Sequence, residues 1–475
     1  MAHDRRGSVR VRQAVRLGIP VLVATMIAAG PGLATAAPAT PDVGPAGTAL
    51  IHGDLASTDS TPHPGPGPSG RLTASSVPGG ACSAVFVGSD GMPVALCTAF
   101  VNLAPPDVAV PTVQLFDPAT AAPLASLPLT KGGLLGGVYG YLDSRDRVVV
   151  ADGSGSITKV AHRRDADGRW TLFADERIDV APHIPEGDAI TSVAPDFQGR
   201  IWFATTEGVV GTVDTAGRVG VTRLPDGEKL TNGLSIRRDG ASVLTARALY
   251  EMRADDTGTP VVRWRRDYAA GAARKPGQLA PGSGTTPTYF GPGDSWVAIV
   301  DDAERPELLV FRADDGAPVC RMPAFETSGQ GTENSPMAWG TSLVVPSTYG
   351  FAYPPMATSG PSDPPNATFV GGMTRIDVTE SGCHRVWEST DRMASLPRLS
   401  RADGLIHGLA YGPVGPVQQL GPVYYTAVDF HTGERRAHRQ VGFAPLDEPL
   451  QLTGTIAPDG SYWQATIGRM LKITG

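Results

Sequence analysis

Residues 190–224 read ITSVAPDFQGRIWFATTEGVVGTVDTAGRVGVTRL. The stretch contains four short apolar runs, and a segment rich in Asp, Gly and Thr separates each run from the next. Val, Ile, Phe and Trp favour strands, whereas Asp and Gly favour turns. The stretch therefore predicts one four-stranded antiparallel unit with turns or loops at 195–199, 205–208 and 215–217.

The same unit recurs along the chain, and the next copy begins at Asn232. Its first turn has counterparts near Gly91, Asp146, Gly199, Gly240, Asp294, Gly340, Gly412 and Gly460. Their mean spacing of about 53 residues, stretched by a Pro-rich insertion at 353–365, is typical of a radial β-propeller. We predict an all-β fold with a single propeller of four-stranded antiparallel blades. Eight blades are favoured and seven are the alternative, with the ring closed by an N-terminal strand from before Cys82.

The composition agrees with a turn-rich globular protein. The 475 residues include 58 Gly and 43 Pro, only 18% are charged, and 41% are hydrophobic. A helical bundle or a coiled coil is excluded by so many helix-breaking residues. The net charge is -7, and removal of residues 1–36, which carry a net charge of +4, would leave -11. Such a surface repels phosphate backbones, so no nucleic acid is expected as a partner.

The N-terminus predicts export from the cytoplasm. Residues 1–36 combine an Arg-rich start, an apolar run at 17–29 and the small-residue exit Ala34-Thr35-Ala36, which is the pattern of a signal peptide. Residues 37–80 are rich in Pro, Gly and Ser and predict a disordered linker. Residues 81–475 then form the propeller domain. We expect a secreted, extracellular monomer whose mature chain has no membrane span.

Four cysteines in an exported chain predict two disulfides. Three connectivities are possible. Locality favours Cys82 with Cys97, because the two flank a turn at 89–91, and this choice leaves Cys320 with Cys383.

Several turns resemble those of quinoprotein-type propellers, whose repeat is Asp-x-x-Thr-Gly followed by an aromatic residue. Residues 429–433 read DFHTG, a similar turn begins at 377–379 and runs to Trp387, and residues 117–120 are a degenerate copy. The resemblance implies a Trp packed between neighbouring blades. Quinoprotein dehydrogenases usually carry an adjacent Cys pair at pyrroloquinoline quinone, and this chain has none. Bound pyrroloquinoline quinone (PQQ) is therefore not favoured.

Residues 232–240 read NGLSIRRDG and resemble the N-G-L/I-x-x-S-P-D-G repeat of gluconolactonase-type (SMP-30-like) propellers. In that family the Asn helps to ligate a catalytic divalent metal in the central funnel, so the resemblance implies this role for Asn232. The chain departs from the family elsewhere. It lacks the E-G-P-x-W motif that supplies a Glu ligand, and residues 285–287 read TTP where an Asp is expected.

The topology of a blade indicates where function lies. The first and third turns of every blade share one face of the ring, here called the turn face. The strand 2–3 loops and the blade-to-blade connections share the other, here called the funnel face. We expect the Asp residues of the turn face to be turn formers only, and we look for a site on the funnel face.

Three groups of funnel-face residues carry candidate chemistry. Oxygen ligands suit Ca²⁺ or another divalent metal, and the candidate ligands are Asn232, Asn334, Glu186 and Asp188. A histidine can serve as a general base near neutral pH, and the candidate is His407. Polar and aromatic side chains beside a funnel suit a sugar ring or another flat ligand, and the candidates are Tyr139, Glu207, Tyr349 and Tyr353.

The sequence favours a secreted propeller that binds a small molecule, a glycan or a protein partner on its funnel face. The alternative is a metal-dependent hydrolase or lyase of the lactonase or streptogramin-lyase kind, with His407 moving protons. A quinone-dependent oxidoreductase comes third. The chain contains no G-x-S-x-G, H-E-x-x-H or P-loop motif, which argues against the hydrolases and nucleotide-binding enzymes that use them.

Overall fold

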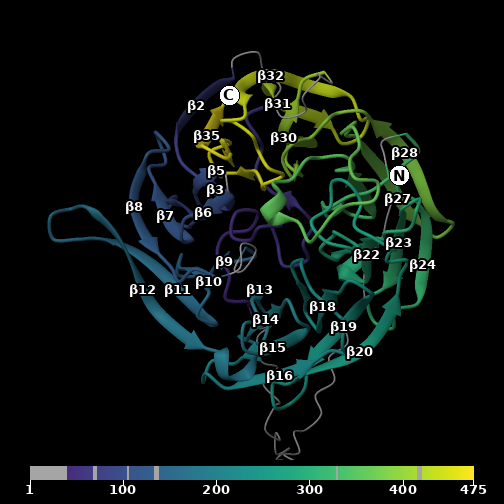
Figure 1. Cartoon of the computed structure of the whole chain (residues 1–475), viewed down its shortest axis with the longest axis horizontal. Coiled ribbons are helices and arrows are strands. Elements are labelled where there is room, and N and C mark those ends of the chain that lie inside the picture. Colours follow the sequence, from purple (N-terminus) through teal and green to yellow (C-terminus); the bar gives the residue numbers. More distant parts are fainter. Residues whose placement is uncertain (1–39, 68–71, 104–105, 133–137, 328–329, 414–419) are drawn as a thin grey trace, which may run out of the picture. The chain divides into compact units, whose positions relative to one another are not determined.

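The computed structural model describes residues 40–67, 72–103, 106–132, 138–327, 330–413 and 420–475, and the predicted signal peptide lies outside these ranges. Residues 40–475 form one compact unit. Within the described ranges, eight sheets of four or more strands are arranged around a central axis (Figure 1). The prediction of an eight-bladed all-β propeller is therefore confirmed.

The blades are numbered here in chain order, each from its innermost to its outermost strand. Blades 1 and 2 consist of β3 (Ala81–Val87), β4 (Pro93–Thr98), β7 (Thr112–Phe116) and β8 (Pro123–Pro128), and of β9 (Tyr141–Leu142), β10 (Val148–Ala151), β11 (Ser156–Arg164) and β12 (Trp170–Asp179). Blades 3 and 4 consist of β13 (Ile190–Pro195), β14 (Ile201–Thr205), β15 (Val209–Val213) and β16 (Val219–Arg223), and of β17 (Ser235–Arg237), β18 (Gly240–Leu244), β19 (Ala248–Ala254) and β20 (Pro260–Asp267).

Blades 5 and 6 consist of β21 (Thr288–Phe290), β22 (Trp296–Val300), β23 (Glu307–Arg312) and β24 (Pro318–Pro323), and of β25 (Met337–Trp339), β26 (Ser342–Pro346), β27 (Met373–Thr379) and β28 (Gly382–Ser389). Blade 7 consists of β29 (Arg398–Ser400), β30 (Leu405–Tyr411), β31 (Gly421–Asp429) and β32 (Arg435–Ala444), and blade 8 of β33 (Thr455–Ile456), β34 (Tyr462–Ala465), β35 (Arg469–Thr474) and β2 (Thr73–Pro78). The remaining elements are β1 (Ser60–Thr61), β5 (Phe100–Leu103), β6 (Pro106–Val108) and the 3₁₀ turns Ala181–His183, Pro292–Asp294 and Pro355–Ala357. None of the helical segments in the described ranges has the length and apolarity required to cross a bilayer.

Blade 3 shows how the sequence builds a blade. Every residue of β13, β14 and β15 is buried, whereas the outermost strand β16 is partly exposed. The first turn is held by Asp196, whose Oδ1 accepts hydrogen bonds from the backbone N–H groups of Gln198 and Arg200 at 2.8 and 2.9 Å. Gly199 supplies the left-handed conformation that the turn requires, with φ 82°. The four-stranded unit expected at 190–224 is confirmed.

The N-terminal strand closes the ring as expected. β2 pairs antiparallel with β35, from Thr73 opposite Thr474 to Pro78 opposite Arg469. Blade 8 thus takes three strands from the C-terminus and its outermost strand from the N-terminus. Closure of this kind removes the free sheet edges that an open array would expose.

The prediction of a disordered linker over 37–80 is wrong for the described residues 40–67. This axial segment makes a circuit around the central axis, and its carbonyls accept hydrogen bonds from backbone N–H groups of the innermost strands of five blades. In chain order, the N–H groups belong to Leu142 of blade 2, Ile236 of blade 4, Tyr289 of blade 5, Ala338 of blade 6 and Leu399 of blade 7. Their respective acceptors are the carbonyls of Ala49, Leu55, Ala56, Thr58 and Asp59. β1 adds a short parallel pairing with β29. A Pro- and Gly-rich composition predicts disorder only when no other surface supplies hydrogen-bond partners, and the channel wall supplies them here.

Blade 7 corrects a second expectation. Its first turn lies at 401–404, between β29 and β30, whereas Gly412 follows β30 on the funnel side. The inner strand β29 has only three residues, beginning with the buried Arg398, so it lacks an apolar run that the sequence pattern would reveal. His407 consequently lies on the second strand of the blade and not before the innermost one.

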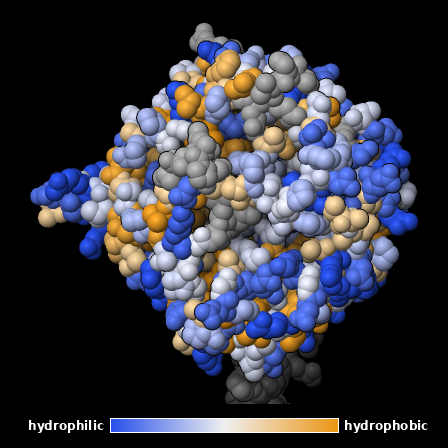
Figure 2. Space-filling view, viewed as in Figure 1, coloured by the Kyte–Doolittle hydropathy of each residue, from blue (hydrophilic) through white to orange (hydrophobic). Residues whose placement is uncertain are grey.

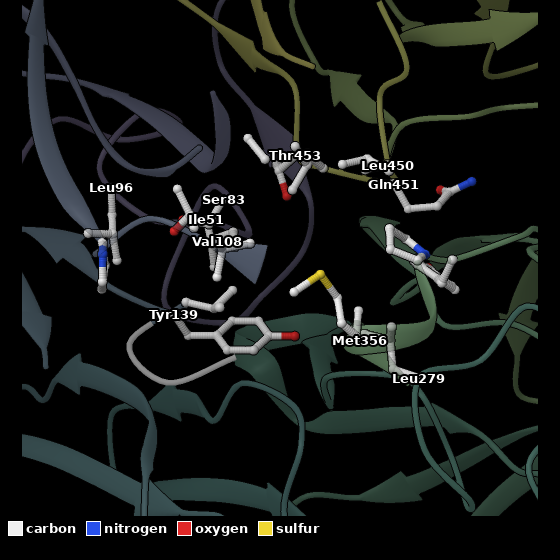
Figure 3. Close-up of a pocket in the computed structure, with 18 of the residues that line it drawn as sticks. Ile51, Ser83, Leu96, Val108, Tyr139, Leu279, Met356, Leu450, Gln451 and Thr453 are labelled. Atoms are coloured by element: carbon white, nitrogen blue, oxygen red, sulfur yellow. The ribbon is translucent and has the colours of Figure 1, made fainter. Parts of the chain in front are cut away.

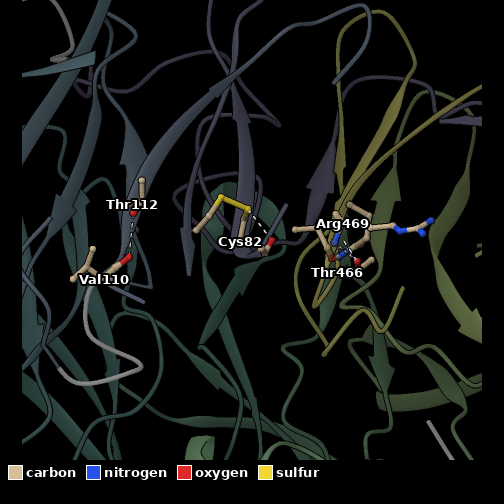
Figure 4. Close-up of a disulfide and its surroundings, with 9 residues drawn as sticks. Cys82, Val110, Thr112, Thr466 and Arg469 are labelled. Carbon is tan, nitrogen blue, oxygen red and sulfur yellow. Dashed lines mark hydrogen bonds between the residues drawn. A yellow bond between two sulfur atoms is a disulfide. The ribbon is translucent and has the colours of Figure 1, made fainter. Parts of the chain in front are cut away.

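Both predicted disulfides are present. Cys82 and Cys97 face each other across β3 and β4 (Figure 4), and Cys320 and Cys383 join the outermost strands of blades 5 and 6.

The resemblance to quinoprotein-type turns implies a Trp packed between neighbouring blades, and the structure contains one. Trp387 of blade 6 packs on Gly433 of blade 7 and donates its indole N–H to the carbonyl of Phe430 at 2.9 Å.

One hairpin extends beyond the ring. The strands β11 and β12 continue outward on one side of the ring, and their tip at 163–169 reads RRDADGR (Figure 1). The space-filling view shows the projection as strongly hydrophilic (Figure 2). Apolar concave surface lies instead at the axis of the ring.

Candidate functional site

The main cavity lies on the axis of the ring and has a volume of about 420 Å³ (Figure 3). Most of its wall consists of blade-to-blade connections and strand 2–3 loops, which share the predicted funnel face, and strands β3 and β4 of blade 1 contribute the rest. The floor is Ile51 and His52 of the axial segment. Most of the lining is apolar, with Leu96, Val108, Leu279, Met356, Leu396, Leu450 and Leu452 as the main contributors.

Tyr139, a predicted ligand-binding residue, lines this cavity. It lies on the connection from blade 1 to blade 2, and its ring stacks on that of His52 with centroids 5.8 Å apart. The hydroxyl points across the cavity toward Met356 and Leu279 (Figure 3). Burial raises the pKa of Tyr139, and the nearby carboxyl of Glu333 adds to the shift, so the phenol stays protonated and can donate a hydrogen bond.

Glu333 is one of two carboxyl residues in the described lining of the cavity, and the other is Asp107. Glu333 lies on the connection from blade 5 to blade 6, and its Oε2 accepts a hydrogen bond from the backbone N–H of Leu279 at 3.0 Å. Burial raises its pKa to about 8, which this hydrogen bond and Arg274 oppose and the charge of Asp302 reinforces. The side chain is therefore mostly neutral at pH 7 and carries an O–H donor in apolar surroundings.

Asn334 also lines the cavity, but its side chain is used structurally. Its Nδ2 donates to Oε1 of Gln451 at 2.9 Å, and Nε2 of Gln451 donates to the carbonyl of Met393 at 2.8 Å. The pair ties the connection between blades 5 and 6 to that between blades 7 and 8. Nδ2 of Asn334 is thus engaged in a contact between two connections that both line the cavity.

The other predicted ligand-binding residues lie in different places. Tyr353 lines the cavity and packs edge-on against Phe351, with ring centroids 4.9 Å apart. Tyr349 does not line it. Glu207 is exposed and pairs with Lys229 at 2.9 Å, away from the axis. The structure thus brings together Tyr139 and Tyr353 of the four.

The four expected metal ligands do not form one site. Asn232 is buried between blades 4 and 5, where its Nδ2 donates to the carbonyls of Ser283 and Thr285 at 3.0 and 3.3 Å. Glu186 and Asp188 line a separate cavity of about 370 Å³ near blades 2 and 3. In the described part of the chain, no three His, Cys, Asp or Glu side chains gather as a metal site would require.

His407, the expected general base, is fully buried inside blade 7. Its Nδ1 lies 2.6 Å from the hydroxyl of Tyr425 and its Nε2 lies 3.2 Å from Oδ2 of Asp403. It does not line the axial cavity. The structure gives it a place in the blade's internal hydrogen bonding, so we do not assign it to the site.

Sequence reasoning missed His52 because it lies in the segment expected to be disordered. The signal available was slight: a histidine followed seven residues later by Asp59, within a Pro- and Gly-rich stretch. In the structure, Nδ1 of His52 lies 2.9 Å from Oδ2 of Asp59, and both side chains are buried.

Comparison with known proteins supports the fold. No known protein family's profile matches the chain. An uncharacterized protein of Archaeoglobus fulgidus is 28% identical over 156 residues, which cover 31% of this chain and 30% of that protein. The matched region is thus less than a third of that relative.

Among solved structures, a europium-containing methanol dehydrogenase is similar at a TM-score of 0.54 and 12% identity, covering 92% of this chain and 98% of that one. A quinohemoprotein alcohol dehydrogenase from Comamonas testosteroni is similar at 0.55 and 11%, covering 89% and 80%. BamB from Moraxella catarrhalis is similar at 0.40 and 14%, covering 70% and 94%. At 11–12% identity the likeness to the two dehydrogenases is one of fold, and it agrees with the quinoprotein-type turns.

Proposed function

We propose that this protein binds a small, uncharged and mainly apolar molecule in the axial cavity of its propeller, outside the cytoplasm. The observation that carries the proposal is the cavity itself. Its volume of about 420 Å³ lies within the range of small-molecule sites, and an apolar lining with few polar groups is typical of them. The two disulfides support a location in an oxidising compartment.

The polar groups of the cavity specify the ligand further. Glu333, with a pKa of about 8, offers a neutral carboxyl, and Tyr139 offers a phenol. Both donate hydrogen bonds, so they suit a carbonyl or ether oxygen of the bound molecule. An anionic ligand would be repelled whenever Glu333 ionised, and Arg274 lowers the pKa of Glu333 without outweighing the effect of burial.

The same residues do not fit PQQ, the cofactor that the quinoprotein-type fold suggests. PQQ carries three carboxylates. In the described lining, Lys131 is the only Lys or Arg, and its Nζ is already paired with Asp107 at 3.1 Å. Taking three carboxylates into this apolar space without cationic partners would be strongly unfavourable. We therefore assign the cavity to an uncharged ligand.

Binding of Nile red tests the proposal, because this dye is uncharged, carries a carbonyl group and fluoresces strongly in apolar surroundings. We expect saturable fluorescence enhancement at one site per chain at pH 7. Met356→Trp, which adds bulk inside the cavity, should weaken binding at least about tenfold by filling the space.

Val262→Trp is the matched control, because Val262 is 45% exposed on the outermost strand of blade 4. It should bind the dye like the unaltered protein. Equal binding by all three proteins would place the dye elsewhere and overturn the proposal. So would the absence of saturable binding to the unaltered protein.

A further inference from the structure

His52 and Asp59 form a buried pair at the floor of the axial cavity. Nδ1 of His52 lies 3.0 and 2.9 Å from Oδ1 and Oδ2 of Asp59. Because a carboxylate can only accept, Nδ1 carries a proton and donates a hydrogen bond to Asp59. In the neutral ring, Nε2 then holds a free lone pair and is an acceptor.

Several contacts fix this pair in position. The backbone N–H of Asp59 donates to the carbonyl of His52 at 2.8 Å, so the segment folds back on itself. Nη1 of the buried Arg398 lies 3.4 Å from Oδ1 of Asp59 and balances its charge. On the opposite side, the His52 ring stacks on Tyr139. The imidazole of His52 is thus held by the Asp59 carboxylate at Nδ1 and by the ring of Tyr139 on one face.

The second nitrogen of His52 has no such partner. His52 is 4% exposed, and its Nε2 makes no hydrogen bond to any described residue. The ring lines the axial cavity on one side. It also lines a cavity of about 20 Å³, which matches the space needed by one water molecule. A buried acceptor without a partner is costly, so this nitrogen is a strong candidate to interact with a ligand.

We propose that His52 and Asp59 are an acid–base dyad that moves a proton of a carbonyl compound bound in the axial cavity. The inference rests on the proposed function, because it requires that the cavity bind such a molecule. Nε2 of His52 accepts a proton from the carbon next to the carbonyl group. The electron pair of that C–H bond moves to form an enol, whose oxygen takes the proton of Glu333.

The reverse steps return both protons, so the balance requires no oxidant, reductant or second substrate. A proton held on Nε2 exchanges with water through the small cavity beside the ring. Each cycle then replaces one α hydrogen with a solvent hydrogen, and a return of the proton to a different carbon would give an isomerisation. Asp59 stabilises the imidazolium form that each cycle creates, as a carboxylate does in other histidine dyads.

Exchange of the α hydrogens of 1-indanone in D₂O tests the dyad. This uncharged ketone is small enough for the cavity, and ¹H NMR follows loss of its α signal at pD 7. We expect the protein to accelerate exchange over buffer by about 100-fold, the scale of general base catalysis. His52→Asn keeps a side-chain donor for Asp59 but removes Nε2, so it should abolish the acceleration. His183→Asn, at an exposed histidine outside the cavity, should leave exchange unchanged.

Displacement of Nile red by 1-indanone separates this inference from the proposed function. Displacement with no acceleration, or with equal acceleration by His52→Asn, would overturn the dyad and leave the binding function intact. Failure to displace bound Nile red would overturn the dyad's substrate class while dye binding still supported the cavity. If the unaltered protein showed no saturable dye binding, both the dyad and the proposed binding function would be overturned.

A measurement on the unaltered protein covers the case in which His52→Asn does not fold. In a ¹⁵N-histidine-labelled sample at pH 7, His52 should show a protonated Nδ1 and an unprotonated Nε2. Addition of 1-indanone should shift the Nε2 resonance. A proton on Nε2 in the free protein, or no shift at saturating ketone, would overturn the proposed role.

Discussion

The carboxyl groups on the two faces of the ring differ in a systematic way. On the turn face, hydrogen bonds to nearby donors hold the pKa of several third-turn aspartates below the usual range, at Asp117, Asp214, Asp255 and Asp315. On the funnel face, burial raises the pKa of other carboxyls, to about 6 for Asp302, about 7 for Glu448 and about 8 for Glu333. At pH 7 these turn-face aspartates are therefore ionised, whereas on the funnel face Glu333 is mostly protonated, Glu448 is about half protonated and Asp302 is mostly ionised.

The comparison indicates that the number of hydrogen-bond donors around a carboxyl decides whether it is ionised in this fold. A tight turn presents several backbone N–H groups to one oxygen, and these stabilise the anion. Funnel-face loops bury their carboxyls with fewer donors. Two residues show that donors, and not the face alone, are decisive. Burial raises the pKa of Asp294 on the turn face, whereas on the funnel face hydrogen bonds from Thr245, Arg265 and Tyr250 outweigh burial and lower the pKa of Glu228.

The largest loss of stability is expected from Asp196→Ala on the turn face. This side chain is buried and accepts from two backbone N–H groups, from Nε of Arg200 at 2.7 Å and from Nε1 of Trp202 at 2.9 Å. Its removal should lower the free energy of unfolding by about 3 kcal/mol, because these donors lose an anionic partner. Denaturant unfolding measures the loss, and Nile red affinity should remain unchanged. Weaker dye binding by the folded variant would contradict the division of roles between the faces.

A gain in stability that depends on pH is expected from Glu333→Gln. In the unfolded chain Glu333 ionises at an ordinary pKa near 4.5, but in the folded protein only near 8. Its contribution to stability is thus complete below pH 4.5 and is lost as pH rises to 8, by at most about 1.4 kcal/mol per pH unit. The amide does not titrate. The Tm of the variant should therefore exceed that of the unaltered protein by a margin that grows from pH 5 to 8.

The same variant tests binding. For the unaltered protein, Nile red affinity should fall as pH rises through 8, because the ionised carboxylate no longer donates a hydrogen bond. Glu333→Gln retains a donor at all pH values, so its affinity should not change over this range. A Tm difference that does not depend on pH would show that Glu333 is ionised in the folded state and would remove the chemical contrast between the faces.

The blades could be predicted from sequence because each one is local. Strand periodicity and Asp–Gly turns recur within about 35 residues, and the closing strand follows from that pattern. The disulfides were predicted from the nearness of Cys82 to Cys97 in the sequence, which left Cys320 with Cys383. β29 escaped prediction because it is short and begins with the buried Arg398. Because the first turn of blade 7 was predicted at Gly412 and not at 401–404, His407 was assigned to the position before the innermost strand. It was therefore predicted to lie on the funnel face, although it is buried within the blade.

The site was less predictable because residues far apart in the chain build it. Tyr139, Tyr353 and Asn334 could be placed on the cavity because the topology of a blade fixes which loops share a face. His52 could not, because composition alone says nothing of the channel that orders the axial segment. The contacts of Asn232 were equally hidden from the sequence, because its Nδ2 donates to the carbonyls of Ser283 and Thr285, more than 50 residues further along the chain.

The smallest effect is expected from Asp315→Asn, the turn-face counterpart of Glu333→Gln. A hydrogen bond from Arg312 at 3.0 Å, with a second from the N–H of Ala317, lowers the pKa of this exposed Asp to about 2. Its contribution to stability is present above the unfolded pKa near 3.9 and is lost as pH falls toward 2. The variant should therefore differ slightly from the unaltered protein in Tm at pH 6 and converge with it near pH 2. Solvent screening keeps the difference small. A difference that widens toward low pH would reverse the sign assigned to the turn face.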